Sequence, residues 1–96
     1  MPLPTKRRVS SDPLQAIPGV GPSIARDLRQ LGVRRVADLK GRSPEQLYDG
    51  LGKLRGVRQD PCLLYTFRCA VYFASTSRPS AERLNWWWWK DRKVTA

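Results

Sequence analysis

The chain has 96 residues, enough for one small domain and too few for a second lobe around a substrate cleft. Its 18 Lys and Arg against 8 Asp and Glu give a net charge of +10, with two cysteines and no histidine. The commonest general base and metal ligand is therefore missing, and two cysteines cannot by themselves complete a structural zinc site. We expect a non-catalytic protein without a metal cofactor.

The excess of positive charge predicts an anionic partner, and for a small basic domain the first candidate is nucleic acid. Most of the cations are arginines, which bind phosphate with two parallel hydrogen bonds. A basic surface that serves only solubility is the alternative. No apolar run approaches the roughly 20 residues of a membrane span, and the N-terminus has no signal-like apolar stretch, so we expect a cytoplasmic protein.

Composition divides the chain into three parts. Residues 1–11, with two prolines and a Lys-Arg-Arg triplet, are expected to form a flexible basic arm. Residues 12–79 carry the helix signals of one domain, and residues 80–96 form a tryptophan-rich segment expected to pack on it. The cations at 6–8 are candidates for phosphate contact, and simple solvation is the alternative.

The first helices surround a glycine-rich bend. Asp12-Pro13 is a helix start, and the sequence PGVGP at residues 18–22 ends that helix. A second helix is expected over residues 22–31, with Gly32 after its end. Its apolar residues recur at the i, i+4 and i+7 positions Ile24, Leu28 and Leu31.

Two later helices begin with a polar cap followed by proline, at Ser43-Pro44 and at Asp60-Pro61. The first of them ends at Gly56, and its expected core residues are Leu47, Leu51 and Leu54. The second runs from 61 to about 75. A short helix at 33–41 precedes them, and the segment 81–93 follows a loop at Pro79. No strand alternation of useful length is present, so the predicted fold is all-α with about five short helices.

The bend predicts a binding site for an anion. Gly19 and Gly21 are expected to have positive φ angles and, without Cβ atoms, to let a phosphate approach the backbone. The N–H groups that follow stand unpaired at the positive end of a helix. Val20 is expected to point into the core. The side chains expected to add phosphate contacts on the following helix are Ser23, Arg26 and Arg29. Such contacts do not read sequence.

The segment LQAIPGVGPSIARDL, residues 14–28, resembles the helix-hairpin-helix DNA-binding motif. The resemblance implies binding to the phosphate backbone of DNA. It also implies a monovalent cation on the carbonyl groups of Ile17 and Val20. The alternative is that PGVGP is only a tight turn in a SAM-like or other helical domain.

A weaker copy of the motif follows 37 residues later, at Leu51, Leu54, Gly56 and Val57, with Arg58 where the first copy has Gly21. This resembles a tandem helix-hairpin-helix domain whose second hairpin is degenerate. In that hairpin Arg55 and Arg58 are expected to contact phosphate through their side chains. The alternative is that the second unit is only scaffold.

Residues 12 to about 93 resemble the pathogenicity-locus family of small bacterial helix-hairpin-helix proteins, some of which carry a mitomycin-resistance label. The segments that carry the resemblance are LQAIPGVGPSIARDLRQLGV, DLKGRSPEQLYD, GVRQDPCLLYTFRCAVYFA and WWWWKDR. The resemblance implies association with DNA, in repair or damage tolerance, without establishing a reaction.

The cysteines and tryptophans each have two interpretations. Cys62 follows a helix start, where the helix dipole is expected to lower its pKa and make it reactive, whereas Cys69 fits the core. Of the four tryptophans at 86–89, at least two are expected to pack on the domain. The exposed ones could stack on unpaired bases or fill a groove on a protein partner.

The sequence therefore predicts a non-catalytic, sequence-independent DNA-binding module. The predicted contacts are Gly19, Val20, Gly21, Ser23, Arg26, Arg29, Arg55 and Arg58. Two alternatives stay open: a protein-interaction adaptor with a basic surface, and a thiol enzyme or redox sensor that uses Cys62. Duplex, single-stranded and branched DNA, and RNA, all belong to the predicted ligand class.

Overall fold

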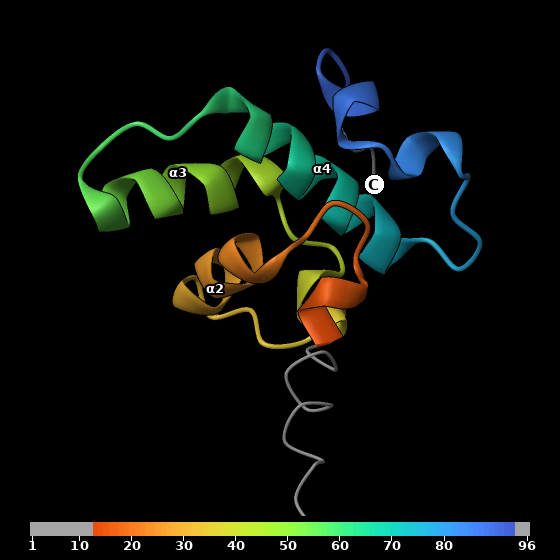
Figure 1. Cartoon of the computed structure of the whole chain (residues 1–96), viewed down its shortest axis with the longest axis horizontal. Helices are drawn as coiled ribbons and strands as arrows, with labels where there is room; N and C mark the ends of the chain where they lie inside the picture. Colours follow the sequence, from red (N-terminus) through yellow and green to blue (C-terminus); the bar gives the residue numbers. More distant parts are fainter. Residues whose placement is uncertain (1–12, 94–96) are drawn as a thin grey trace, which may run out of the picture.

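All regular structure in residues 13–93, the part of the chain that the computed structural model describes, is helical (Figure 1). The α-helices are α2 (Pro22–Gln30), α3 (Pro44–Arg55) and α4 (Pro61–Ser75). The 3-10 turns are η1 (Pro13–Ala16), η2 (Val36–Leu39), η3 (Glu82–Leu84) and η4 (Trp86–Trp89). The all-α prediction is confirmed. The predicted arm at 1–11 and the predicted cap Asp12 lie outside the described residues.

The expected count of about five helices differs from three α-helices and four 3-10 turns in residues 13–93. The segment at 33–41 and the one that begins at Pro13 each form a single 3-10 turn, and the segment at 81–93 forms two, η3 and η4. Gly32 and Gly41 bracket the first of these segments and Pro13 and Pro18 the second, which leaves too few residues to offset the cost of starting an α-helix. No helix in the described range is long and apolar enough to cross a membrane.

Local capping sets the ends of α3 and α4 as predicted. The Ser43 hydroxyl accepts a hydrogen bond from the Gln46 N–H (3.2 Å), and the Asp60 carboxylate accepts one from the Cys62 N–H (2.8 Å). Helix α3 stops at Gly56, whose φ of +69° is the left-handed conformation that glycine adopts without a Cβ penalty.

Helix α4 is the element on which α3 and three of the 3-10 turns pack. It contacts α3 along one side and η2, η3 and η4 elsewhere, and it lies across the middle of the molecule in Figure 1. Phe67, in the middle of α4, is fully buried. The aliphatic side chains buried with it are Leu14, Ile17, Val20, Ala25, Leu28, Val33, Leu39, Leu47, Leu51, Ala70 and Val71.

The last turn of α3 leaves the core, so the expectation that Leu54 is a core residue is wrong: its side chain is 58% exposed. This end of α3 reaches the edge of the molecule (Figure 1), whereas Leu51, one turn earlier, is fully buried. From there Arg55 reaches back to α2. Its guanidinium pairs with the buried carboxylate of Asp27 and donates a hydrogen bond to the Gln30 side-chain oxygen (3.1 Å).

A buried arginine on α4 holds the tryptophan segment. The Arg68 guanidinium donates to the Trp89 carbonyl (2.8 Å) and pairs with the Glu45 carboxylate at the start of α3 (3.1 Å). Trp89 is itself buried, and its indole N–H donates to the Arg83 carbonyl (2.8 Å). Turn η4 therefore has one defined position on the domain.

We predict that Arg55→Met destabilises the fold by about 1–3 kcal/mol, because it leaves the buried Asp27 carboxylate without its charged partner. Urea unfolding followed by circular dichroism measures the change. Arg34→Met is the control, because the Arg34 side chain is exposed, and we expect it to change stability by less than about 0.5 kcal/mol. Equal stability of the two variants would contradict a supporting role for the pair.

Candidate nucleic-acid interface

The bend between η1 and α2 is fixed by two buried apolar side chains. Ile17 and Val20 are 1% and 5% exposed, and the Val20 N–H donates to the Ile17 carbonyl (3.0 Å). Gly19 lies between them on the surface with φ +84°, a conformation that strains other residues. The bend crosses α4 on its way from η1 to α2 (Figure 1). Its backbone therefore faces outward while its side chains anchor it.

The expected positive φ angle at Gly21 is wrong. Gly21 has φ −96° and ψ −171°, extended backbone that any residue can adopt, because it is the N-cap of α2. A Cβ at this position would meet no atom within 4 Å. Only Gly19 is thus required by the backbone conformation. Gly21 contributes by lacking a side chain that could cap the helix.

The first turn of α2 has unpaired backbone donors. Pro22 has no N–H, and the first intrahelical hydrogen bond runs from the Ala25 N–H to the Gly21 carbonyl (2.9 Å). Within residues 13–93 no group accepts a hydrogen bond from the N–H of Ser23 or of Ile24. Two donors therefore point out of the positive end of a nine-residue helix, where an anion is stabilised.

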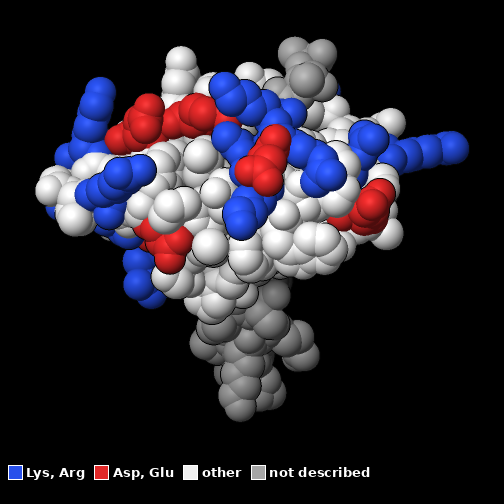
Figure 2. Space-filling model, turned by 90° about the horizontal axis from the view of Figure 1, so that it is seen from above, with Lys and Arg blue, Asp and Glu red and all other residues white. Residues whose placement is uncertain are grey.

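The predicted arginines divide into two groups. Arg26 and Arg29 are exposed on α2, and Arg58 is exposed after α3. Arg55 is exposed as a residue, but its guanidinium forms the ion pair with Asp27 described above. On the face seen from above, Lys and Arg are interleaved with Asp and Glu and do not form one continuous patch (Figure 2). The basic groups on this face are therefore discrete side chains.

The turn at Gly56 shares with the turn at Gly19 only a glycine with a positive φ angle. Gly56 has φ +69°, but Val57 is 60% exposed where Val20 is buried. The Val57 N–H donates to the Gly52 carbonyl (3.1 Å), which closes the end of α3. Helix α4 starts only at Pro61, and Asp60 caps its first turn. The start of α4 is therefore capped, whereas the start of α2 at Ser23 and Ile24 is not.

Of the two carbonyl groups expected to bind a cation, that of Ile17 already accepts a hydrogen bond. The Ile17 carbonyl accepts the Val20 N–H, so one of its two lone pairs is left for an ion.

The expectation of a lowered pKa at Cys62 is wrong. Partial loss of water around the thiol and, second, the Asp60 carboxylate raise the pKa of Cys62, and the nearby charge of Lys90 opposes them more weakly. The thiol therefore does not gain the lowered pKa expected from its place at a helix start. Burial raises the pKa of Cys69 to about 11. Neither thiol is activated.

Sequence reasoning did not place the tryptophan segment next to the bend. The indole Cδ1 of Trp86 lies 3.9 Å from the position that a Cβ on Gly19 would occupy, and Thr66 Cγ2 of α4 lies 4.0 Å from it. The run of tryptophans signalled exposed aromatic surface, but only the tertiary fold brings it to Gly19.

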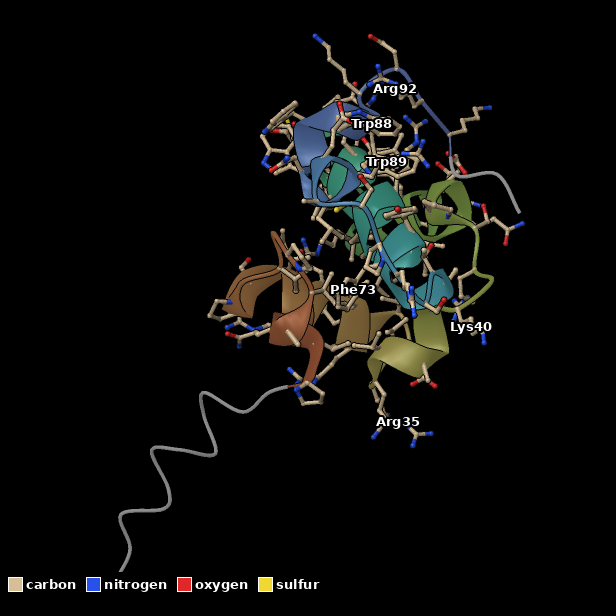
Figure 3. The ribbon with its side chains drawn as sticks, turned by 90° about the vertical axis from the view of Figure 1, so that its right-hand side faces the viewer. Arg35, Lys40, Phe73, Trp88, Trp89 and Arg92 are labelled. Carbon is tan, nitrogen blue, oxygen red and sulfur yellow. The ribbon has the colours of Figure 1, made fainter. Side chains whose placement is uncertain are left out.

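Trp88 and Trp89 have a structural role. Trp88 packs edge-on against Trp89 (ring centroids 4.8 Å apart), and the guanidinium carbons of Arg92 and Arg83 lie 4.1 and 5.1 Å from the Trp88 ring centre. Figure 3 shows Trp88, Trp89 and Arg92 gathered in this way at one end of the molecule, with Arg35 and Lys40 pointing away at the other.

Comparison with known proteins gives one family and one relative. The family model Cdd1, described as pathogenicity locus, matches residues 7–94. Mitomycin resistance protein McrB of Streptomyces lavendulae is 40% identical over 58 residues, which are 60% of this chain and 55% of that protein. The aligned part thus spans about half the length of that relative. No solved structure matches the chain.

The two thiols should differ in reactivity. At pH 7 we expect Ellman's reagent to label Cys62 more slowly than a free cysteine peptide, because its raised pKa leaves less thiolate, with the rate rising as the pH increases. Cys69 should react only after denaturation. Stopped-flow absorbance of wild type and of Cys62→Ser separates the two sites, and faster labelling of Cys62 than of the peptide would revive the reactive-thiol hypothesis.

Proposed function

This chain belongs to the pathogenicity-locus family, and we propose that it is a non-catalytic cytoplasmic module that binds DNA through phosphates without reading sequence. The observation that carries the proposal is the pair of unpaired N–H groups at Ser23 and Ile24, at the start of α2. The net charge of +10 supports it, because such a surface attracts a polyanion.

The geometry suggests how one phosphate would be held. Its oxygens would accept hydrogen bonds from the two N–H groups at the positive end of α2, and the exposed Ser23 hydroxyl lies at the same turn. Arg26 follows about one turn along α2, and Arg29 about another, so both are suited to neighbouring phosphates. Gly19, with its positive φ angle, makes the turn that brings the backbone to the start of α2.

We propose that the turn at Gly56 serves mainly to support the fold. The bend at 17–21 and helix α2 would form the binding hairpin of a tandem helix-hairpin-helix domain, and the turn at Gly56 its degenerate partner. Arg58 is available there for a side-chain contact, whereas Arg55 would position α2 through Asp27.

The printed name of the relative, a mitomycin resistance protein, suggests the setting. We propose that DNA binding by this chain serves DNA repair or damage tolerance. If the chain were instead an adaptor for an acidic protein, capture of that protein from a lysate would survive nuclease treatment.

Substitutions at Gly21 test the site, because this position tolerates a side chain. Gly21→Asp should weaken binding to a labelled duplex about tenfold or more, since an N-cap carboxylate occupies the same N–H groups and repels phosphate. Gly21→Ser, which caps without charge, should show a smaller loss. Gly21→Ala cannot cap and is the matched control, expected to bind within about twofold of wild type.

Fluorescence anisotropy at 50 mM salt gives the affinities, and thermal unfolding shows whether each variant is folded. If a folded Gly21→Asp protein binds like Gly21→Ala, the start of α2 is not the phosphate site.

The salt dependence of binding tests the side chains. The logarithm of the binding constant should fall linearly with the logarithm of salt concentration, with a slope of about −0.9 per phosphate neutralised. Arg26→Gln should make the slope shallower by about one and weaken binding to unrelated duplex sequences equally. Loss restricted to one sequence would contradict backbone recognition.

A further inference from the structure

Two of the four tryptophans present large apolar surface to solvent. Trp86 is 39% exposed and Trp87 57% exposed, whereas Trp89 is buried and Trp88 is covered by Trp89 and two arginines. The fold uses the second pair: the Trp89 ring packs on Tyr72 of α4, the Trp89 carbonyl accepts a hydrogen bond from Arg68, and Trp88 packs on Trp89. The exposure of the first pair has no such structural use.

These exposed rings lie where the proposed ligand would pass. The Trp86 ring adjoins Gly19 and Thr66, as described above. Lys90, in the residue position after η4, is close enough to influence Cys62, one turn before Thr66. The N-terminal half of α4 thus brings an indole, a cation and the bend together on one side of the molecule.

The rings are also held in place before any ligand arrives. The burial of Trp89 and the hydrogen bond from Arg68 to its carbonyl fix η4, so the adjoining rings lose little freedom on binding. A fixed, exposed indole beside a phosphate-binding surface is the arrangement that stacks unpaired bases.

We propose that Trp86 and Trp87 form a stacking site for unpaired nucleobases, so that a single strand is bound more tightly than a strand of equal charge without bases. The inference rests on the proposed function, since the bend and its arginines would hold the phosphates of the same strand. Duplex bases are already stacked within the helix and cannot lie on these rings.

Charge favours a nucleic acid over a protein groove as the occupant. Three cations, Lys90, Arg92 and Lys93, and one acid, Asp91, make up the four residues after the tryptophans, and Arg92 already stacks on Trp88. A partner that buried two indoles in an apolar groove would also have to cover these cations. A strand places bases on the rings and phosphates next to the cations.

The test compares three fluorescein-labelled 12-mers by anisotropy at one salt concentration: a single strand, its duplex, and an abasic strand with the same phosphates. Wild type should bind the single strand about 5- to 100-fold more tightly than the abasic strand. Trp86→Ala should lose most of that difference, Trp86→Phe should restore part of it, and duplex affinity should change less than twofold. Trp87→Ala should behave like Trp86→Ala.

Leu54→Ala is the matched control, because it removes an equally exposed apolar side chain at the end of α3 and should leave all three affinities unchanged. Thermal unfolding checks each variant, and the comparison of base-containing and abasic strands needs no variant. Equal binding of those two strands by wild type would overturn the stacking site while leaving phosphate binding intact. Binding of none of the three at 50 mM salt would instead overturn the proposed function and the stacking site with it. If an apolar peptide bound to these rings and the single strand did not, the rings would be assigned to a protein partner.

Discussion

The burial of Ile17 and Val20 is the constraint on which the rest of the surface depends. Because both side chains are held in the core, the backbone between them must turn outward, and only a residue that adopts a positive φ angle without strain can make that turn. Gly19 meets the requirement. Helix α2 then starts at once, at Pro22, with its first N–H groups exposed rather than folded beneath a neighbouring element.

Comparison of the two glycine turns shows why a short motif is not sufficient to define a site. Both have a left-handed glycine followed by valine. After Gly56 the chain travels on before α4 begins, and Asp60 supplies an acceptor for the first turn of α4. After Gly19 no such acceptor is present among the described residues. What distinguishes the turns is therefore the group at the N-cap.

The features that depend on a few neighbouring residues in the sequence were predicted correctly. The limits of α4 and the caps at Ser43 and Asp60 could be read from the sequence, since each depends on a few neighbouring residues. The exposure of Leu54 could not, because it depends on where the helices around α3 end. The pKa of Cys62 depends on how far the fold removes water from the thiol and on the charges of Asp60 and Lys90 near it. Of the candidate site, the bend was predicted, but the pairing of Arg55 with Asp27 and the approach of Trp86 to Gly19 depend on tertiary packing.

The attachment of the tryptophan segment has a consequence for the integrity of the chain. The connection at residues 76–81 lies largely on the surface, whereas the segment after it is held by the Arg68 guanidinium and by the burial of Trp89 against Tyr72. A peptide bond broken in that connection would leave the shorter fragment docked in its place. A nicked molecule would thus migrate as one particle in gel filtration and come apart only in denaturant.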